Sequence, residues 1–191
     1  MPQRWMLFFL ADWMILAASD PAGACTAPPG SARVPVPALS GCAAYFSPSS
    51  STCCDKNKTD LLNINFREAV IPFLGACPAC VRNLEALWCT YSCSPRQADW
   101  ATNATSLRMS ADYNQELYES CQDTTFRQVH AGLKVRQVYP TAENFTRHMM
   151  GFESHIQVEF VRGQGRLAFS APLQRCQDDC TCEQCRSACT K

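Results

Sequence analysis

Cysteine is the residue type in this chain that could take part in the most kinds of chemistry, and 14 of the 191 residues are cysteines. Four of them, Cys77, Cys80, Cys89 and Cys93, lie within seventeen residues of one another. Cysteines at such spacings can ligate zinc, exchange electrons in a thiol–disulfide reaction, or form structural disulfides. Other features of the sequence indicate which of these three uses applies.

Metal binding and redox catalysis are the less favoured uses. The pairs Cys77–Cys80 and Cys182–Cys185 have the Cys-x-x-Cys spacing of zinc knuckles, but zinc–thiolate sites are mainly intracellular. A thioredoxin-like motif needs a strand followed by a helix, and a proline-rich coil with helices does not provide that context. We therefore expect structural disulfides, with neither a metal nor a cofactor.

Other catalytic motifs are missing from the sequence. It has no Gly-x-Ser-x-Gly, His-Glu-x-x-His or phosphate-loop pattern, and its three histidines, His130, His148 and His155, are scattered. Its 17 basic and 17 acidic residues balance, which argues against a nucleic acid or an anionic membrane as partner. We expect a binding protein and no enzymatic activity.

The N-terminus is typical of a secretory signal peptide. Arg4 precedes an apolar stretch over residues 5–18, and small residues at 22–24 offer a cleavage site before Cys25, with a cut after Ala18 as the alternative. This predicts a signal peptide over residues 1–24 and a single domain over residues 25–191. No later segment reaches the roughly 18 apolar residues that a membrane span requires.

Glycosylation sequons agree with the secretory pathway. Asn-x-Thr occurs at Asn57, Asn103 and Asn144. Disulfides persist in that oxidising environment. We therefore place the protein outside the cell or in the endosomal, lysosomal or vacuolar lumen.

Periodicity predicts four helices and one short hairpin. Residues 25–52 and the loop 94–110 are polar or proline-rich without periodicity, and residues 124–140 are ambiguous. A strand at 155–161 alternates polar and apolar residues, and residues 166–170 could return as its hairpin partner. Apolar residues recur at helical spacing in residues 59–72, 78–93, 109–121 and 141–150. The fold class expected is α+β: a disulfide-rich, mostly helical single domain with a small antiparallel sheet.

The cysteine-rich helical stretch also resembles a known family. The pattern Cys-Pro-Ala-Cys-x-x-Asn-Leu-x-x-Leu-Trp-Cys-x-x-x-Cys-Ser-Pro-Arg-Gln over residues 77–97 resembles the N-terminal luminal domain of the Niemann-Pick C type 1 sterol transporters. Folate and riboflavin receptors share the Cys-x-x-x-Cys-Ser-Pro core but match its flanks less well. Further motifs follow in the family's order, namely Cys53-Cys54-Asp, Leu117-Tyr-x-x-Cys121, Asn144-Phe-x-x-x-Met149 and Cys180-x-Cys-x-x-Cys-x-x-x-Cys189.

The resemblance implies a disulfide pairing that uses every cysteine once. Fourteen cysteines allow on the order of 10⁵ connectivities, so spacing alone could not select one. The implied pairs are Cys25–Cys53, Cys42–Cys89, Cys54–Cys93, Cys77–Cys180, Cys80–Cys121, Cys176–Cys185 and Cys182–Cys189.

The resemblance also implies an apolar sterol pocket that takes the sterol hydroxyl deep inside. Asn65 would be a polar group of the pocket, and residues 131–133 fall where the family has its pocket mouth. The family's first cysteine loop has no counterpart in residues 25–45, and its pocket glutamine is replaced by Lys58 or Thr59. The ligand-binding residues implied are Leu61, Leu62, Asn65, Leu84, Trp88, Ile156 and Val158.

The function expected is binding and transfer of a sterol or related lipid in intracellular sterol transport. A soluble sterol-delivery protein is an expected partner, and a membrane is involved only through a missing C-terminal region if the chain is a fragment. One alternative is a folate- or riboflavin-type vitamin carrier, although Trp88 and Trp100 are the only tryptophans beyond the signal peptide. The other is a secreted recognition module without a small ligand.

Overall fold

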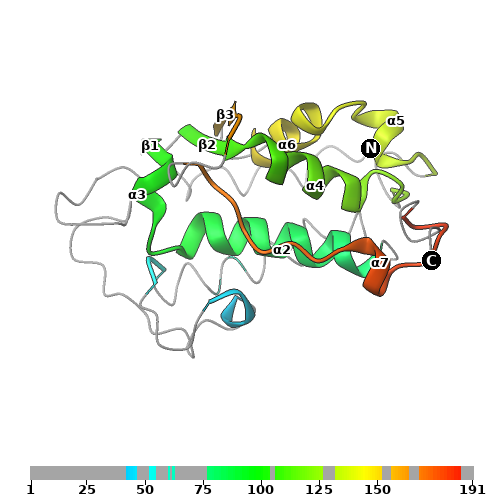
Figure 1. Cartoon of the computed structure of the whole chain (residues 1–191), viewed down its shortest axis with the longest axis horizontal. Coiled ribbons are helices and arrows are strands. Elements are labelled where there is room, and N and C mark those ends of the chain that lie inside the picture. Colours follow the sequence, from blue (N-terminus) through cyan, green and yellow to red (C-terminus); the bar gives the residue numbers. More distant parts are fainter. Residues whose placement is uncertain are drawn as a thin grey trace, which may run out of the picture.

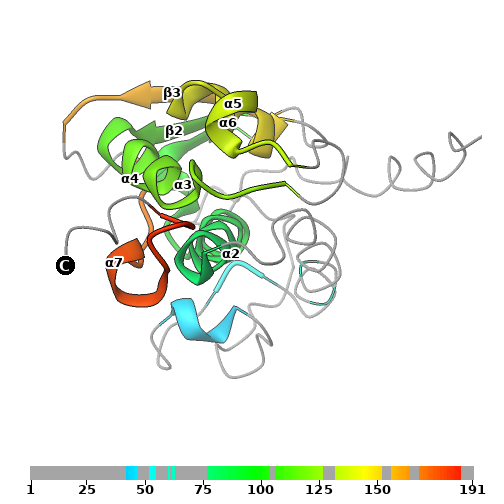
Figure 2. The same cartoon turned by 90° about the vertical axis from the view of Figure 1, so that its right-hand side faces the viewer.

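A long central helix, α2 (Pro78–Cys93), has the remaining elements arranged around it (Figure 1). The computed structural model describes residues 42–46, 52–54, 60, 62, 77–103, 106–126, 132–151, 156–163 and 168–185. Viewed along α2, helices α4 and α6 and the sheet lie on one side, while the short 3-10 helix η2 (Ala43–Tyr45) lies on the other (Figure 2).

Helix α2 begins and ends as its sequence predicts. Pro78 occupies the first turn, where no backbone N–H is needed, and Cys77 before it is extended. Ser94 adopts φ −60° and ψ 132°, because a residue that precedes proline is pushed out of the helical region. Leu84 and Leu87 are fully buried on the face toward α4 and the sheet.

Two further helices pack over this face of α2. Ser110 caps α4 (Ala111–Cys121) by accepting a hydrogen bond from the Tyr113 backbone N–H at 3.4 Å. Thr141 does the same for α6 (Ala142–Gly151), whose Asn144 N–H donates to Thr141 Oγ1 at 3.2 Å. The shorter helices are α3 (Gln97–Trp100), α5 (Val135–Val138) and α7 (Cys176–Asp179).

The sheet has three strands in the order β1–β2–β3 and mixed direction. Strand β1 (Ala101–Asn103) is antiparallel to β2 (Ser106–Ser110), and β2 is parallel to β3 (Gln157–Val161). Met109 of β2 pairs with Phe160 of β3 and also forms a bridge with Phe169, so Phe160 and Phe169 lie on opposite edges of β2.

The predicted α+β class with a small sheet is confirmed, but the sheet is mixed where an antiparallel one was expected, and two further details were wrong. The expected hairpin of 155–161 with 166–170 does not form in the described residues: Phe169 exchanges backbone hydrogen bonds with Arg108 and Ser110 of β2 instead. The predicted loop up to Ser110 and helix start at Met109 are also incorrect, because residues 106–110 form β2. Leu107 and Met109 are both buried and alternate with partly buried residues. This strand pattern covers only the five residues of β2.

Within the described residues, the buried apolar side chains form two clusters on opposite sides of α2. The larger one, here called the main core, lies among α2, α4, α6 and the sheet, and includes Leu84, Leu107, Leu117, Phe145 and Phe169. The smaller one, here called the second cluster, consists of Cys42, Cys54, Leu62, Cys89 and Cys93. Within the described residues, no helix is both long and apolar enough to cross a membrane.

Candidate ligand-binding site

Disulfides fasten both ends of α2 to distant parts of the chain. At its N-terminal end, Cys77 is bonded to Cys180 and Cys80 to Cys121. At its C-terminal end, two bridges join α2 to the N-terminal segments that carry η2 and residues 52–54. Together with one bridge inside the C-terminal segment, the described pairs are Cys42–Cys89, Cys54–Cys93, Cys77–Cys180, Cys80–Cys121 and Cys176–Cys185.

These five bridges are five of the seven pairs that the family resemblance implied. Cys53 and Cys182 are disulfide-bonded as well. Their predicted partners, Cys25 and Cys189, lie outside the described residues. The framework therefore fixes α2 between the second cluster and the C-terminal segment, and it positions every candidate binding residue on this helix.

The predicted pocket residues are distributed over the two clusters. Leu84, Ile156 and Val158 are buried together in the main core. Leu62 is buried in the second cluster, on the other side of α2. Trp88 packs against both clusters and is only partly buried, so it lies where the two meet. Leu61 and Asn65 lie outside the described residues.

The first predicted helix is described at two residues only. Asp60 and Leu62 are helical. The sequon residue Asn57 lies outside the described residues, as do Lys58 and Thr59, which replace the family's pocket glutamine, and Ala131 of the expected pocket mouth. Leu133, at the other end of that mouth segment, is the large hydrophobic residue most exposed to solvent among those described.

A row of aromatic rings extends from Trp88 into the main core. The ring of Trp88 meets Tyr91 edge-on at 6.2 Å, and Tyr91 lies 5.9 Å from Trp100 of α3. Trp100 in turn packs edge-on against Phe169 at 5.0 Å, and Phe169 against Tyr113 at 5.4 Å. The helical spacing of Tyr91 and Trp88 indicated a shared face, whereas nothing in the sequence marked Trp100 or Phe169 as their neighbours.

Burial keeps the tyrosines of this row uncharged into alkaline solution. Burial raises the pKa of Tyr91 to about 12, and it raises the pKa of Tyr113 still further. Both therefore carry a neutral phenol at physiological pH. Trp100, Phe169 and Tyr113 are buried in the main core, so only Trp88 and Tyr91 of this row are partly exposed and could contact an apolar molecule.

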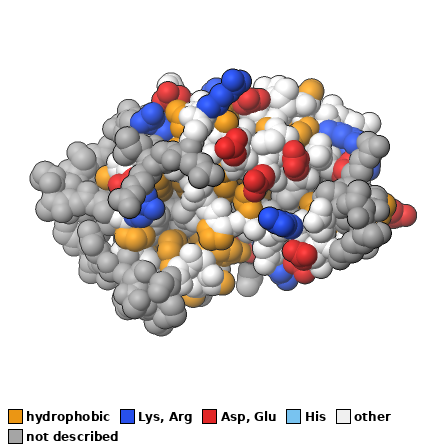
Figure 3. Space-filling view, in the orientation of Figure 1, with side chains coloured by type: hydrophobic (Ala, Val, Ile, Leu, Met, Phe, Trp, Pro, Cys, Tyr) orange, Lys and Arg blue, Asp and Glu red, His pale blue; other side chains and the backbone are white. Residues whose placement is uncertain are grey.

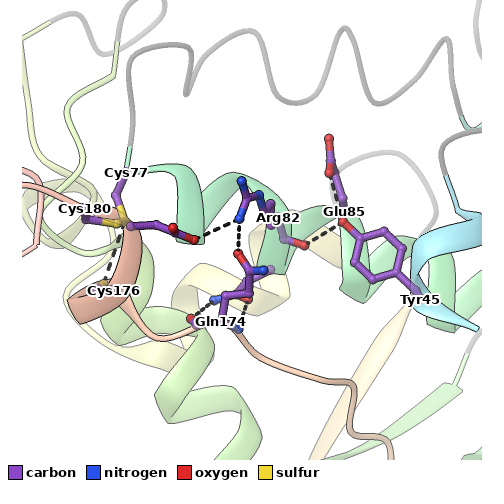
Figure 4. Close-up of polar contacts among 9 residues, drawn as sticks. Tyr45, Cys77, Arg82, Glu85, Gln174, Cys176 and Cys180 are labelled. Atoms are coloured by element: carbon purple, nitrogen blue, oxygen red, sulfur yellow. Dashed lines mark hydrogen bonds and ion pairs between the residues drawn. A yellow bond between two sulfur atoms is a disulfide. The ribbon is translucent and has the colours of Figure 1, made fainter.

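Tyr45 ties η2 to α2 and was missed by sequence reasoning. Its hydroxyl donates to Glu85 Oε2 at 3.0 Å and lies 3.3 Å from the Arg82 carbonyl oxygen (Figure 4). Burial, and secondarily the Glu85 charge, raise the pKa of Tyr45. The only local signal was its position three residues after Cys42, whose bridge to Cys89 brings η2 against α2.

The sulfurs of Cys77, Cys176 and Cys180 lie within 4.8 Å of one another at the opposite end of α2. All three belong to disulfides. A metal is bound by thiolates, and a disulfide sulfur supplies none. This group therefore does not fit a metal centre in its oxidised form.

A surface cleft of about 440 Å³ lies beside α7, away from the predicted pocket residues. Its lining is mostly polar and exposed, and contains no residue of the main core's interior. This lining does not suit a rigid apolar ligand. The lining residues are Leu173, Gln174, Arg175, Asp178 and Asp179.

Comparison with known proteins gives a match over most of the chain. Residues 38–191 match the family described as the Niemann-Pick C1 N terminus. The matched range includes both clusters and all five described bridges.

Two relatives are similar over shorter segments. Over 109 residues, 44% of this chain and 8% of the relative, the sequence is 26% identical to the NPC intracellular cholesterol transporter 1 homolog 1 of Caenorhabditis elegans. Over 59 residues, 31% of this chain and 4% of the relative, it is 37% identical to the NPC intracellular cholesterol transporter 1 of Sus scrofa. The chain thus aligns with a small part of the length of each relative.

Proposed function

Because the chain belongs to the Niemann-Pick C1 N-terminal family, we propose that it binds a sterol or related lipid and hands it on chemically unchanged. The observation that carries this proposal is the family match over residues 38–191. Relatives named as intracellular cholesterol transporters support the same ligand class. The role proposed is a binding step in intracellular sterol transport.

We place the ligand at Trp88, between the two clusters. Among the described residues, four of the five buried members of the second cluster are half-cystines, so covalent bridges help to hold this side of α2 in shape. A pocket needs such external support, because an unfilled interior cannot be fixed by close packing. Figure 3 shows hydrophobic side chains gathered in the lower left of the molecule, over the region where α2 ends and η2 lies.

The proposed walls come from both sides of this junction. Leu61, Leu62 and Asn65 would come from the helix expected over residues 59–72, of which Leu62 is buried in the second cluster, and Asn65 would be the polar group for a hydroxyl. Trp88 packs against both clusters, and Leu84, Ile156 and Val158 lie in the main core on the other side of α2. Apolar walls with a single polar group are what a rigid ring system with one hydroxyl requires.

The remaining sequence predictions belong to the same proposal. Residues 1–24 would be a cleaved signal peptide, and residues 25–191 a luminal or extracellular domain that receives its sterol from a soluble delivery protein. Glycans would be attached at Asn57, Asn103 and Asn144. Support comes from Asn144, whose side chain is exposed on the first turn of α6.

Direct binding tests the proposal. The glycosylated protein, secreted from cultured cells, is incubated with tritiated cholesterol and with unlabelled cholesterol, folate or riboflavin as competitors, and in parallel with tritiated folate and tritiated riboflavin. We expect saturable binding that unlabelled cholesterol removes and the two vitamins leave intact. Binding of a vitamin without sterol would replace the proposal by a carrier function, and binding of none of the three would favour a recognition module.

Two leucine variants test where the sterol lies. Leu62→Ala removes a proposed wall residue and should weaken sterol binding about tenfold or more, the scale expected for a few lost methylene contacts. Leu117→Ala makes the same truncation in the main core, where it should cost about 2–5 kcal/mol of stability without changing affinity below its melting temperature. Equal affinity losses in both variants would contradict the placement.

A further inference from the structure

We propose that the junction of α7 with the start of α2 is a site of thiol–disulfide exchange, at which an external thiol re-pairs Cys77 from Cys180 to Cys176 and frees Cys185. The reacting partner is a small-molecule or protein thiol. This chemistry is independent of sterol binding, and it uses two bridges that the proposed pocket does not contain.

The two bridges involved are in contact. Cys77 is bonded to Cys180, and Cys176 to Cys185, yet the Sγ atom of Cys77 lies only 3.9 Å from that of Cys176 (Figure 4). A thiolate formed on Cys77 would therefore lie close to the sulfur that it must attack in the neighbouring disulfide. The three sulfurs of Cys77, Cys176 and Cys180 together lie within 4.8 Å.

Differences in burial select the sulfur that an external thiol can reach. Cys77 is fully buried and Cys176 and Cys185 are nearly so, whereas Cys180 is partly exposed. An incoming thiolate therefore attacks Cys180 and expels Cys77. Cys77 is the N-cap residue of α2, where the partial positive charge of the helix end stabilises the thiolate that leaves.

Two exchange steps then follow with atoms and electrons in balance. In the first, the external sulfur bonds to Cys180, the Cys77–Cys180 bond breaks, and its electron pair stays on Cys77. In the second, Cys77 bonds to Cys176, the Cys176–Cys185 bond breaks, and Cys185 leaves as a thiolate that takes a proton from solvent. One thiol is consumed and one is produced, and two disulfides remain two, so no further oxidant or reductant is required.

The exchange changes how the C-terminal segment is anchored. At present Cys180 ties the end of α7 to α2. After exchange the tie moves to Cys176 at the start of α7, and Cys180 and Cys185 lose their bonds to Cys77 and Cys176, while Cys182 keeps its own disulfide. The ion pair between Arg82 and Asp179, at 2.9 Å, has both side chains substantially exposed and holds this segment only weakly.

Partial reduction with mapped thiols tests the proposal. The protein is exposed to limiting reduced glutathione, quenched with acid, labelled with N-ethylmaleimide, digested without reduction and analysed by mass spectrometry. We expect glutathione on Cys180, the maleimide on Cys185 and a peptide pair linked through Cys77 and Cys176. A first label on Cys77, or on a cysteine of any other bridge, would overturn the proposal.

Two variants test the second exchange step. Cys180→Ser leaves one cysteine unpaired without any reductant, and we expect Cys185 to carry the larger share of the maleimide label. A label that stays on Cys77 would overturn the exchange step. The matched control, Cys176→Ser with Cys185→Ser, lacks the bridge that Cys77 attacks, so Cys77 should take the label after glutathione treatment of that protein.

Discussion

Tyr113 places in the main core a polar group that has no partner among the described residues. Its residue is only 4% exposed, and its hydroxyl has no hydrogen-bond partner among the described residues. A buried polar group left in this state costs about 1–3 kcal/mol in desolvation. Tyr118, on the same helix, differs because its hydroxyl donates to the Tyr139 carbonyl oxygen at 2.7 Å.

The two tyrosines therefore predict opposite effects of the same substitution. Tyr113→Phe should raise the free energy of unfolding by about 1 kcal/mol, because it removes the unpaired hydroxyl and keeps the ring. Tyr118→Phe should lower it by about 1 kcal/mol, because a hydrogen bond is lost. Urea denaturation of both variants measures this. A loss of stability in Tyr113→Phe would mean that its hydroxyl is hydrogen-bonded in solution.

Tyr91 predicts how stability depends on pH in alkaline solution. Its pKa is about 12 when folded and 10 when unfolded, so above pH 10 the unfolded chain binds fewer protons than the folded one. The contribution of the neutral Tyr91 phenol to stability is thus fully present below pH 10. The free energy of unfolding should fall as pH rises from 10 toward 12. Denaturation in thiol-free buffers across this range should show a shallower fall in Tyr91→Phe, and an unchanged slope would contradict the assignment.

At the scale of elements, Asn83 joins α2 to the C-terminal segment. Its side chain imitates a backbone pair: Nδ2 donates to the Gln174 carbonyl at 3.0 Å, and Oδ1 accepts from the Gln174 N–H at 2.7 Å (Figure 4). Asn83 is 1% exposed, so neither bond is readily replaced by water. The neighbouring Arg82 contacts the same segment through Gln174 and Asp179 but is about half exposed.

Replacing these neighbours should separate the buried contact from the exposed one. Asn83→Ala should lower the free energy of unfolding by about 2 kcal/mol and make the segment after Gln174 more sensitive to proteolysis, because both backbone groups lose partners. Arg82→Ala should cost less than about 1 kcal/mol. Urea denaturation and limited proteolysis supply both readouts. Equal losses would show that the exposed ion pair is as important as the buried amide.

The helices could be predicted from the sequence because their signals are local. Pro78, Ser94 before Pro95, and the spacing of Leu84 and Leu87 define α2 without reference to anything distant. Strand β2 could not, because its two buried residues, Leu107 and Met109, stand directly before a helical pattern. Its parallel pairing with β3 joins residues about 50 positions apart. Such a pairing has no short connecting turn whose sequence could predict it, as a hairpin has.

The candidate site was predictable only in part, for a related reason. Burial of Leu62, Leu84, Ile156 and Val158 follows from their apolar side chains at regular spacing. That these residues divide between two sides of α2, with Trp88 at the junction, depends on tertiary packing. The pairing of the bridges that set this arrangement was predicted from the family resemblance, because cysteine spacing alone leaves the connectivity open.

At the scale of the molecule, α2 is the element shared by both clusters, and two bridges of similar loop length act on different sides of it. Cys54–Cys93 closes a separation of 39 residues and holds the second cluster, and Cys80–Cys121 closes 41 residues and joins α2 to α4 in the main core. Loop closure of this length is worth about 4 kcal/mol in either case. The two bridges therefore stabilise the fold by a similar entropic amount, and they differ in the side of α2 on which they act.

The two double-alanine variants should consequently lose different parts of the structure. With Cys54→Ala and Cys93→Ala, hydrogen exchange should quicken at the Cys53 amide, which donates to the residue-93 carbonyl oxygen at 2.9 Å, while α4 and α6 stay protected. With Cys80→Ala and Cys121→Ala, protection should fall in α2 and α4 together. Sterol binding should be lost in the first variant even at temperatures where its main core remains folded, because the pocket side of α2 has opened. Uniform loss of protection in both variants would mean instead that the two clusters unfold as one unit, and the pocket would then have no separate stability to lose.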